Sequence, residues 1–124
     1  MPHRLRFHRR RGFRLPDNAL RVARPSRFSN PFRVAQMPGK EYYLVFLPHS
    51  YEGTLAHRIL RSRQYSHLTQ REAHALAVEC YRELLERRPL PGRDLEALRG
   101  KDLACYCPLD LPCHADVLLE LANR

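Results

Sequence analysis

The sequence predicts a single compact α/β domain, in which helices pack on a small sheet of about three to five strands. Its 124 residues suffice for one domain with a modest core, and 44% hydrophobic with 28% charged residues is ordinary for a globular chain. Short β-rich segments alternate with segments that repeat apolar residues at helical spacing. We divide the chain into a basic N-terminal arm, residues 1–14, and the α/β domain, residues 15–124.

Three short segments are predicted as strands of one sheet. Residues 19–23 (ALRVA) alternate apolar and basic side chains, which is the period of a strand. Residues 42–47 (YYLVFL) give the strongest strand signal, and their unbroken apolar character predicts burial on both faces. Residues 101–105 form the third predicted strand and lead into the cysteine-rich C-terminal region.

Two longer helices are predicted from apolar periodicity, over residues 70–87 and 113–122. Thr69 and Glu72 fit a capping box at the start of the first helix, and Pro89 ends it. The apolar face of this helix contains Ala73, Leu76, Ala77, Cys80, Tyr81, Leu84 and Leu85. Because Cys80 lies on that face, we interpret it as a small core residue and not as a metal ligand.

The intervening segments carry weaker signals. Residues 91–98 are predicted as a short helix with Gly100 as its C-terminal cap. Residues 48–68 fit no single long element, and residues 55–60 are compatible with either a helical turn or a strand. The histidines of this stretch are interpreted as ordinary surface or core residues: His49, His57 and His67.

The positive charge is confined to the first quarter of the chain. The net charge is +9, and residues 1–34 hold ten arginines with Asp17 as their one acid, which also gives +9. Arginine favours forked contacts to phosphate. We therefore interpret the arm, with its triplet Arg9, Arg10 and Arg11 and its rings Phe7 and Phe13, as a phosphate-contacting segment. The alternative is a frayed terminus with an edge strand over residues 5–8.

A loop follows the first predicted strand. Residues 24–33 (RPSRFSNPFR) are rich in turn residues, and Phe28 and Phe32 are expected to anchor them to the core. The candidate anion-binding residues of this loop are Arg24, Ser26, Arg27 and Asn30. A structured surface loop without a ligand is the alternative interpretation.

The composition excludes some classes of protein. No apolar run approaches the roughly 20 residues that a membrane span needs, and the basic N-terminus is not followed by the apolar stretch of a secretory signal. We therefore expect a cytoplasmic protein with reduced cysteines and no membrane partner. The oligomeric state stays open.

Three of the four cysteines and a histidine lie close together near the C-terminus: Cys105, Cys107, Cys113 and His114. In a strand, Cys105 and Cys107 would point to one side, with Tyr106 on the other. Three thiolates and one imidazole suit tetrahedral zinc, the one cofactor that the sequence suggests. The difficulty is that side chains adjacent on a helix diverge by about 100°, so Cys113 and His114 can converge only if the backbone is irregular there.

Two other interpretations of this cluster stay open. A thiol at a helix start has a lowered pKa, so Cys113 is a candidate nucleophile, with His114 as general acid–base and Asp116 as a general base or orienting group. Alternatively, the strand, turn and helix pack tightly and the cysteines are small hydrophobic residues.

Two stretches of the chain carry a family resemblance. Residues 9–32 (RRRGFRLPDNALRVARPSRFSNPF) and residues 98–123 (LRGKDLACYCPLDLPCHADVLLELAN) resemble the bacterial and phage family called domain of unknown function 4326. That family often has Trp-Gly where this chain has Phe28-Ser29, and Trp in place of Tyr106. The resemblance implies a shared site but transfers no catalytic residue, and its phage context favours work on nucleic acid or nucleotides.

The sequence thus supports two functional hypotheses. The first is a small basic domain that binds nucleic acid or nucleotides. The second is a small enzyme that uses Cys113 or His114 on a nucleotide or another phosphorylated substrate, held by Arg24 and Arg27 and oriented by Asn30. If strands 19–23 and 101–105 are parallel, the loops that follow them should lie close together. Arg24, Ser26 and Asn30 should then come within side-chain reach of Cys107, Cys113 or His114.

Overall fold

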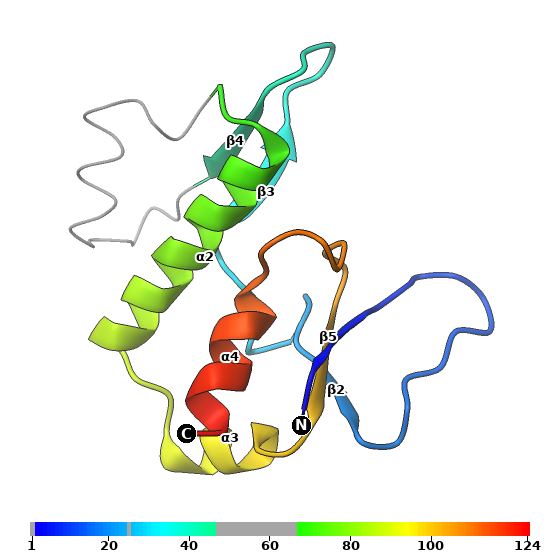
Figure 1. The fold of residues 1–124 in the computed structure, drawn as a ribbon, viewed down its shortest axis with the longest axis vertical. Helices are drawn as coiled ribbons and strands as arrows, with labels where there is room; N and C mark the ends of the chain where they lie inside the picture. The colour runs from blue at the N-terminus through cyan, green and yellow to red at the C-terminus, as the bar shows by residue number, and fades with distance from the viewer. Residues whose placement is uncertain (1, 25, 47–66) are drawn as a thin grey trace. The chain divides into compact units, whose positions relative to one another are not determined.

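The computed structural model describes residues 2–24, 26–46 and 67–124 (Figure 1). In these residues the chain forms five strands and three helices, so the predicted α/β class is confirmed. Contacts group the chain into two units, Met1–Ser29 with Leu90–Arg124, and Asn30–Pro89, which we describe in turn. The predictions for Leu47, residues 55–60, His49 and His57 lie outside the described residues.

The first unit is built on a three-stranded parallel sheet. Its strands are β1 (Arg4–Arg6), β5 (Asp102–Cys105) and β2 (Ala19–Arg21), with β5 in the centre (Figure 1). Leu5 pairs with Ala104, and Leu20 pairs with Leu103. The parallel arrangement of β2 and β5 therefore agrees with the prediction, and the loops after both strands start at the same edge of the sheet.

Residues 4–6, which the sequence analysis assigned to the basic arm, are a strand of this sheet. Leu5 alternates with two arginines, and its neighbours in the chain extend the pairing, since Phe7 N–H donates to the carbonyl of Cys105 at 2.7 Å. The start of the N-terminal segment is thus held by the backbone of β5.

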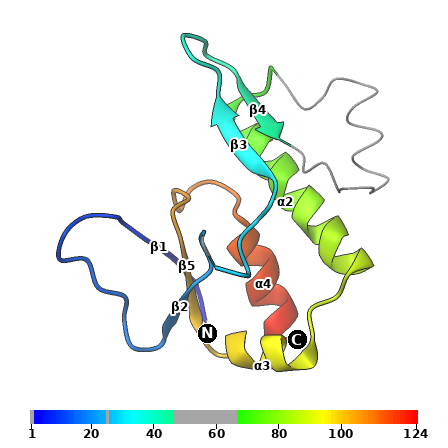
Figure 2. The same ribbon diagram turned by 180° about the vertical axis from the view of Figure 1, so that it is seen from behind.

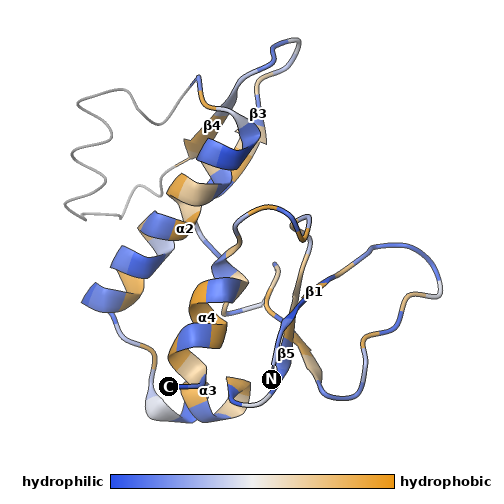
Figure 3. Cartoon of the chain, viewed as in Figure 1, coloured by the Kyte–Doolittle hydropathy of each residue, from blue (hydrophilic) through white to orange (hydrophobic). Residues whose placement is uncertain are grey.

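Two helices complete the first unit. Helix α4 (His114–Ala122) packs on β5 and β1, and helix α3 (Gly92–Leu98) packs against α4. Figure 3 shows hydrophobic and hydrophilic residues alternating along α4, whose buried residues include Val117 and Leu118. Gly100 takes a positive φ of 74° just after α3, the conformation in which glycine serves as a helix terminator.

The second unit is a β-hairpin covered by a helix (Figure 2). Strands β3 (Arg33–Gln36) and β4 (Tyr43–Phe46) pair antiparallel, and helix α2 (Gln70–Arg87) packs on both. The prediction that residues 42–47 share a sheet with the other two predicted strands is wrong: among the described strands β4 pairs only with β3, and Tyr43 adds an isolated bridge to Leu68. Burial on both faces is also wrong: Val45 is buried, but the side chain of Phe46 is 54% exposed, as befits a two-stranded sheet with one covered face.

Helix α2 forms as its local signals predict. Thr69 Oγ1 accepts from Glu72 N–H at 3.1 Å, and the Glu72 carboxylate accepts from Thr69 N–H at 2.9 Å, so the capping box is present. The buried positions are Ala73, Ala77, Cys80, Tyr81 and Leu85, most of the predicted face. Among the described residues, no helix has both the length and the apolar character to span a membrane.

Cys80 is fully buried, as predicted for a core residue. Burial raises the pKa of its thiol to about 12, from an ordinary value of 9.0, with the charges of Glu83 and Glu79 adding to the effect. At a pH between these two pKa values, the thiol is therefore protonated in the folded chain and ionised in the unfolded chain.

We expect this thiol to destabilise the protein in alkali. Because the folded pKa is raised, the stability that the protonated thiol contributes is complete below pH 9 and is lost as the pH rises from 9 to about 12, on the order of 1 kcal/mol per pH unit. Urea unfolding of the parent and of Cys80→Ala across this range measures the difference. Identical alkaline slopes for the two proteins would contradict the assignment.

Candidate metal centre

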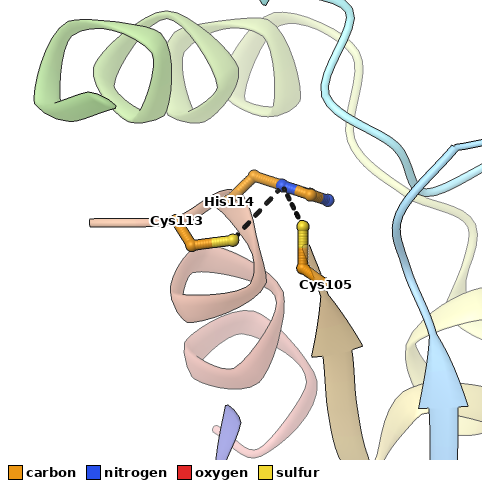
Figure 4. A group of neighbouring side chains, drawn as sticks. All are labelled: Cys105, Cys113 and His114. Atoms are coloured by element: carbon orange, nitrogen blue, oxygen red, sulfur yellow. Dashed lines mark hydrogen bonds between the residues drawn. The ribbon is translucent and has the colours of Figure 1, made fainter. Parts of the chain in front are cut away.

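The four predicted metal ligands come together at the end of β5 and the start of α4. Cys105 ends β5, Cys107 lies two residues on, Cys113 is the N-cap of α4 and His114 is its first residue. The Sγ atoms of Cys105 and Cys107 are 3.7 Å apart. His114 Nδ1 lies 3.7 Å from Cys113 Sγ and 4.0 Å from Cys105 Sγ (Figure 4). The donor atoms of Cys105, Cys113 and His114 all lie within 4.8 Å of one another.

The backbone at Cys113 explains how adjacent residues converge. Cys113 has φ −146° and ψ 149°, so it is extended, whereas His114 is already helical. The 100° divergence expected within a helix does not apply across this boundary. The irregular backbone that the sequence analysis required is thus the ordinary geometry of an N-cap residue.

A backbone carbonyl fixes the orientation of the His114 ring. Its Nε2 lies 2.9 Å from the carbonyl oxygen of Val22, the residue that follows β2, and the side chain is buried. A carbonyl only accepts hydrogen bonds, so Nε2 carries a hydrogen, and Nδ1 is the nitrogen that faces the thiols. This arrangement, with the second ring nitrogen held by a carbonyl, is typical of histidines that ligate metals.

The spacing of the donors fits a tetrahedral zinc ion. With Zn–S near 2.3 Å and Zn–N near 2.0 Å, two sulfurs lie about 3.8 Å apart and a sulfur and a nitrogen about 3.5 Å apart. The observed separations of 3.7, 3.7 and 4.0 Å are close to these values. Cys105, Cys113 and His114 thus form the compact donor group, and Cys107, whose Sγ lies 3.7 Å from that of Cys105, is the neighbouring thiol that could complete a Cys₃His set.

The side chains of the cluster shift one another's pKa values in different directions. Hydrogen bonds from Cys107 and Cys113 lower the pKa of the Cys105 thiol, and the bond to Cys105 raises the pKa of Cys107. Burial disfavours the charged form of His114, but hydrogen bonds to Cys105 and Cys113 outweigh it and raise the pKa of the imidazole to about 10. A metal that binds here must displace these protons, so its affinity falls as the pH falls.

Arg4 holds the turn that carries two of the donors. Its side chain, only 10% exposed, donates to the carbonyls of Leu109 and Pro108 at 2.6 and 3.5 Å and pairs with Asp116 at 3.2 Å. The carboxylate of Asp116 also accepts from Cys113 N–H at 3.2 Å. Asp116, predicted as a candidate general base, is therefore engaged with the helix cap and with Arg4.

A second group of side chains gathers on Tyr106, which lies between Cys105 and Cys107. Arg9 Nε and Arg21 Nη2 both donate to the Tyr106 hydroxyl at 2.7 Å. The Phe7 ring meets the rings of Phe13 and Tyr106 edge to face, each at 5.2 Å between centroids. Arg21 also lies over the rings of Phe7 and Tyr106, at 4.7 and 5.4 Å from their centroids.

The other predicted phosphate-binding residues have varied surroundings. Arg10 and Arg11 are exposed in the loop between β1 and β2, much of which has the hydrophilic colour in Figure 3. Arg27 pairs with Asp94 at 2.9 Å, and Ser26 Oγ accepts from Phe28 N–H at 3.1 Å. The carbonyl of Arg24 accepts from Arg21. The expectation that Arg24, Ser26 and Asn30 come within side-chain reach of Cys107, Cys113 or His114 stays a prediction.

Asn30 belongs to the second unit and has partners there. Its amide donates to the Ala77 carbonyl at 3.1 Å and its oxygen accepts from Phe32 N–H at 3.0 Å. The expected anchors Phe28 and Phe32 are both buried, as predicted.

Sequence reasoning missed three residues that shape the site: Arg4, Arg21 and Tyr106. Arg4 and Arg21 counted only toward the charge, and Tyr106 only as the residue between two cysteines. The available signal was that Arg4 and Arg21 alternate with apolar residues in β1 and β2. Their partners in the site, Asp116 and Tyr106, lie 85 or more positions away along the chain.

Comparison with known proteins gives one match. A family model described as domain of unknown function (DUF4326) matches residues 5–124, essentially the whole chain. Searches of curated proteins and of solved structures found no match.

Proposed function

Because the chain belongs to the DUF4326 family, whose description names no activity, we propose its function from the site itself: the protein is a zinc-binding domain. Cys105, Cys107, Cys113 and His114 would hold the ion. The convergence of Cys105, Cys113 and the oriented His114 imidazole, with the Cys107 thiol 3.7 Å from that of Cys105, supports this proposal. When bound, zinc would tie the end of β5 to the start of α4.

The donor count favours a structural role. Catalytic zinc sites keep one position open for water or substrate, whereas four protein donors fill a tetrahedron. Cys113 and His114, the candidate catalytic residues, would both be occupied as ligands. The same residues that suggest a nucleophile therefore suit a closed metal site better.

Metal analysis of protein purified without a histidine tag tests this proposal. We expect about one zinc per chain, lost in Cys105→Ser and in Cys107→Ser, because each variant removes one thiolate of a four-ligand set. Cys80→Ala is the matched control: it removes a buried cysteine outside the cluster and should retain the metal.

Two results would count against zinc. Metal-free protein with one fast-reacting thiol at Cys113 would favour the enzyme hypothesis. Metal-free protein with slow thiols throughout would leave the cysteines as packing residues.

A second function, binding of nucleic acid, is favoured by the distribution of charge. Among the described residues of the first 34, several arginines are exposed and form no ion pair with an acidic side chain, such as Arg10, Arg11 and Arg14. Such a surface is attracted to phosphates whatever their sequence. We propose that this basic segment, not the zinc centre, contacts nucleic acid.

The dependence of affinity on salt measures this binding. We expect the logarithm of the affinity for DNA to fall linearly with the logarithm of salt concentration, and the slope to shrink in the double variant Arg10→Ala/Arg11→Ala by up to about two. Point variants are preferable to deletion of residues 1–11, because deletion removes strand β1. An unchanged slope in the double variant would exclude these two residues as contacts.

A further inference from the structure

Two cations converge on one neutral oxygen in the first unit. Arg9 Nε and Arg21 Nη2 each lie 2.7 Å from the hydroxyl oxygen of Tyr106. A phenol oxygen has two lone pairs, so both are used by the guanidinium groups and the hydroxyl hydrogen points elsewhere. The tyrosine thus holds two positive groups together and retains one donor of its own.

No acidic group balances this pair in the part of the chain that the structure describes. Arg4 and Arg27 have Asp116 and Asp94 as ion-pair partners, whereas Arg9 and Arg21 have none. The Nε of Arg21 is buried and has no hydrogen-bond acceptor. Bringing two like charges together costs energy, which an anion between them would offset.

Aromatic rings hold the two guanidinium groups in place. Arg9 lies over the Tyr106 ring at 4.8 Å, and Arg21 lies over Phe7 at 4.7 Å. Cation–π contacts stabilise a charge without neutralising it. The guanidinium groups are therefore ordered before any ligand arrives, which lowers the entropic cost of binding.

We propose that Arg9, Arg21 and Tyr106 form a binding site for the phosphate group of a nucleotide or of a nucleic-acid chain. Guanidinium groups bind phosphate oxygens through forked, charge-assisted hydrogen bonds, and the tyrosine hydroxyl donates a further one. The rings of Phe7, Phe13 and Tyr106 beside these groups suit a ligand that carries a base. The inference rests on the proposed nucleic-acid binding and names the place of contact.

The experiment compares variants of the full chain. Arg21→Met removes one guanidinium but keeps an apolar side chain, and Tyr106→Phe removes only the oxygen on which both arginines converge. Arg88→Met, an exposed position in the second unit, removes the same charge elsewhere. For a single-stranded oligonucleotide we expect a roughly tenfold loss of affinity in Arg21→Met, a smaller loss in Tyr106→Phe, and little change in Arg88→Met.

The probes separate the possible ligands. A 5′-mononucleotide should bind more tightly than its nucleoside, because only the former carries the phosphate. Tight binding of the mononucleotide alone would identify a free nucleotide as the ligand, and tight binding only of the oligonucleotide would identify a nucleic-acid chain; either supports the site. Thermal unfolding of each variant shows whether it is folded. If Arg21→Met is unfolded, Tyr106→Phe becomes the variant that tests the site.

Two failures are distinguishable. If Arg21→Met and Arg88→Met lose the same affinity, or if nucleoside and nucleotide bind equally, the phosphate site is wrong while general binding stands. If the parent protein binds no phosphorylated probe at any salt concentration, the proposed nucleic-acid function fails together with the site.

Discussion

Removal of the proposed zinc ion by a strong chelator is expected to destabilise the protein on the order of 5 kcal/mol or more, because structural zinc contributes its binding energy directly to folding. A domain of this size is usually stable by only about 5–15 kcal/mol. Without metal, two buried thiols and a buried imidazole, Cys105, Cys113 and His114, lie close together where charges are costly, with the half-buried Cys107 beside them. Thermal unfolding with and without chelator measures the effect as a fall in Tm.

Several controls define this prediction. Added Zn²⁺ should restore the Tm, whereas Mg²⁺ should not, because thiolate ligands select soft ions. Cys107→Ser should already be unstable and should respond little to chelator, while Cys80→Ala should respond like the parent protein. A parent protein whose unfolding does not change with chelator would contradict a structural metal.

Helix α2 could be predicted because its signals are local. The capping box of Thr69 and Glu72, the apolar periodicity and Pro89 all lie within the helix or next to it. The partners of β4 were not predictable in the same way. Its apolar run resembles a central strand, yet β3, with the mixed sequence RVAQ, is its one strand partner among the described residues. Pairing between strands depends on segments that local patterns do not connect.

In the candidate site, too, the local features could be predicted from the sequence and the long-range contacts could not. The sequence identified the three residues of the cluster, Cys105, Cys113 and His114, together with the neighbouring Cys107, because clustered cysteine and histidine residues are rare enough to be noticed. It did not show that Cys113 is extended or that the carbonyl of Val22, 92 positions before His114, orients the imidazole. Both features come from the parallel packing of β2 beside β5 and from the start of α4, which only the fold reveals.

Arg4 is the residue outside the donor set whose loss we expect to weaken the centre most. It joins strand β1 to the turn before α4 through two carbonyls and Asp116. Arg4→Met keeps the apolar stem but leaves these groups without their charged donor, which should cost about 2–3 kcal/mol of stability. Because Asp116 also caps α4 at Cys113, we expect zinc affinity to fall roughly 10–100-fold, as for other groups that orient metal ligands.

Arg6→Met provides the matched control for this effect. Arg6 lies two residues along the same strand and is exposed, so its replacement removes an equal charge without touching the turn. Competition for zinc with a chromophoric chelator gives the affinity, and urea unfolding of the zinc-loaded proteins gives the stability. If Arg4→Met and Arg6→Met have the same zinc affinity and the same free energy of unfolding, Arg4 affects the site only through its charge. If Arg4→Met alone loses affinity, the first strand of the chain helps to set the geometry of ligands more than 100 positions later.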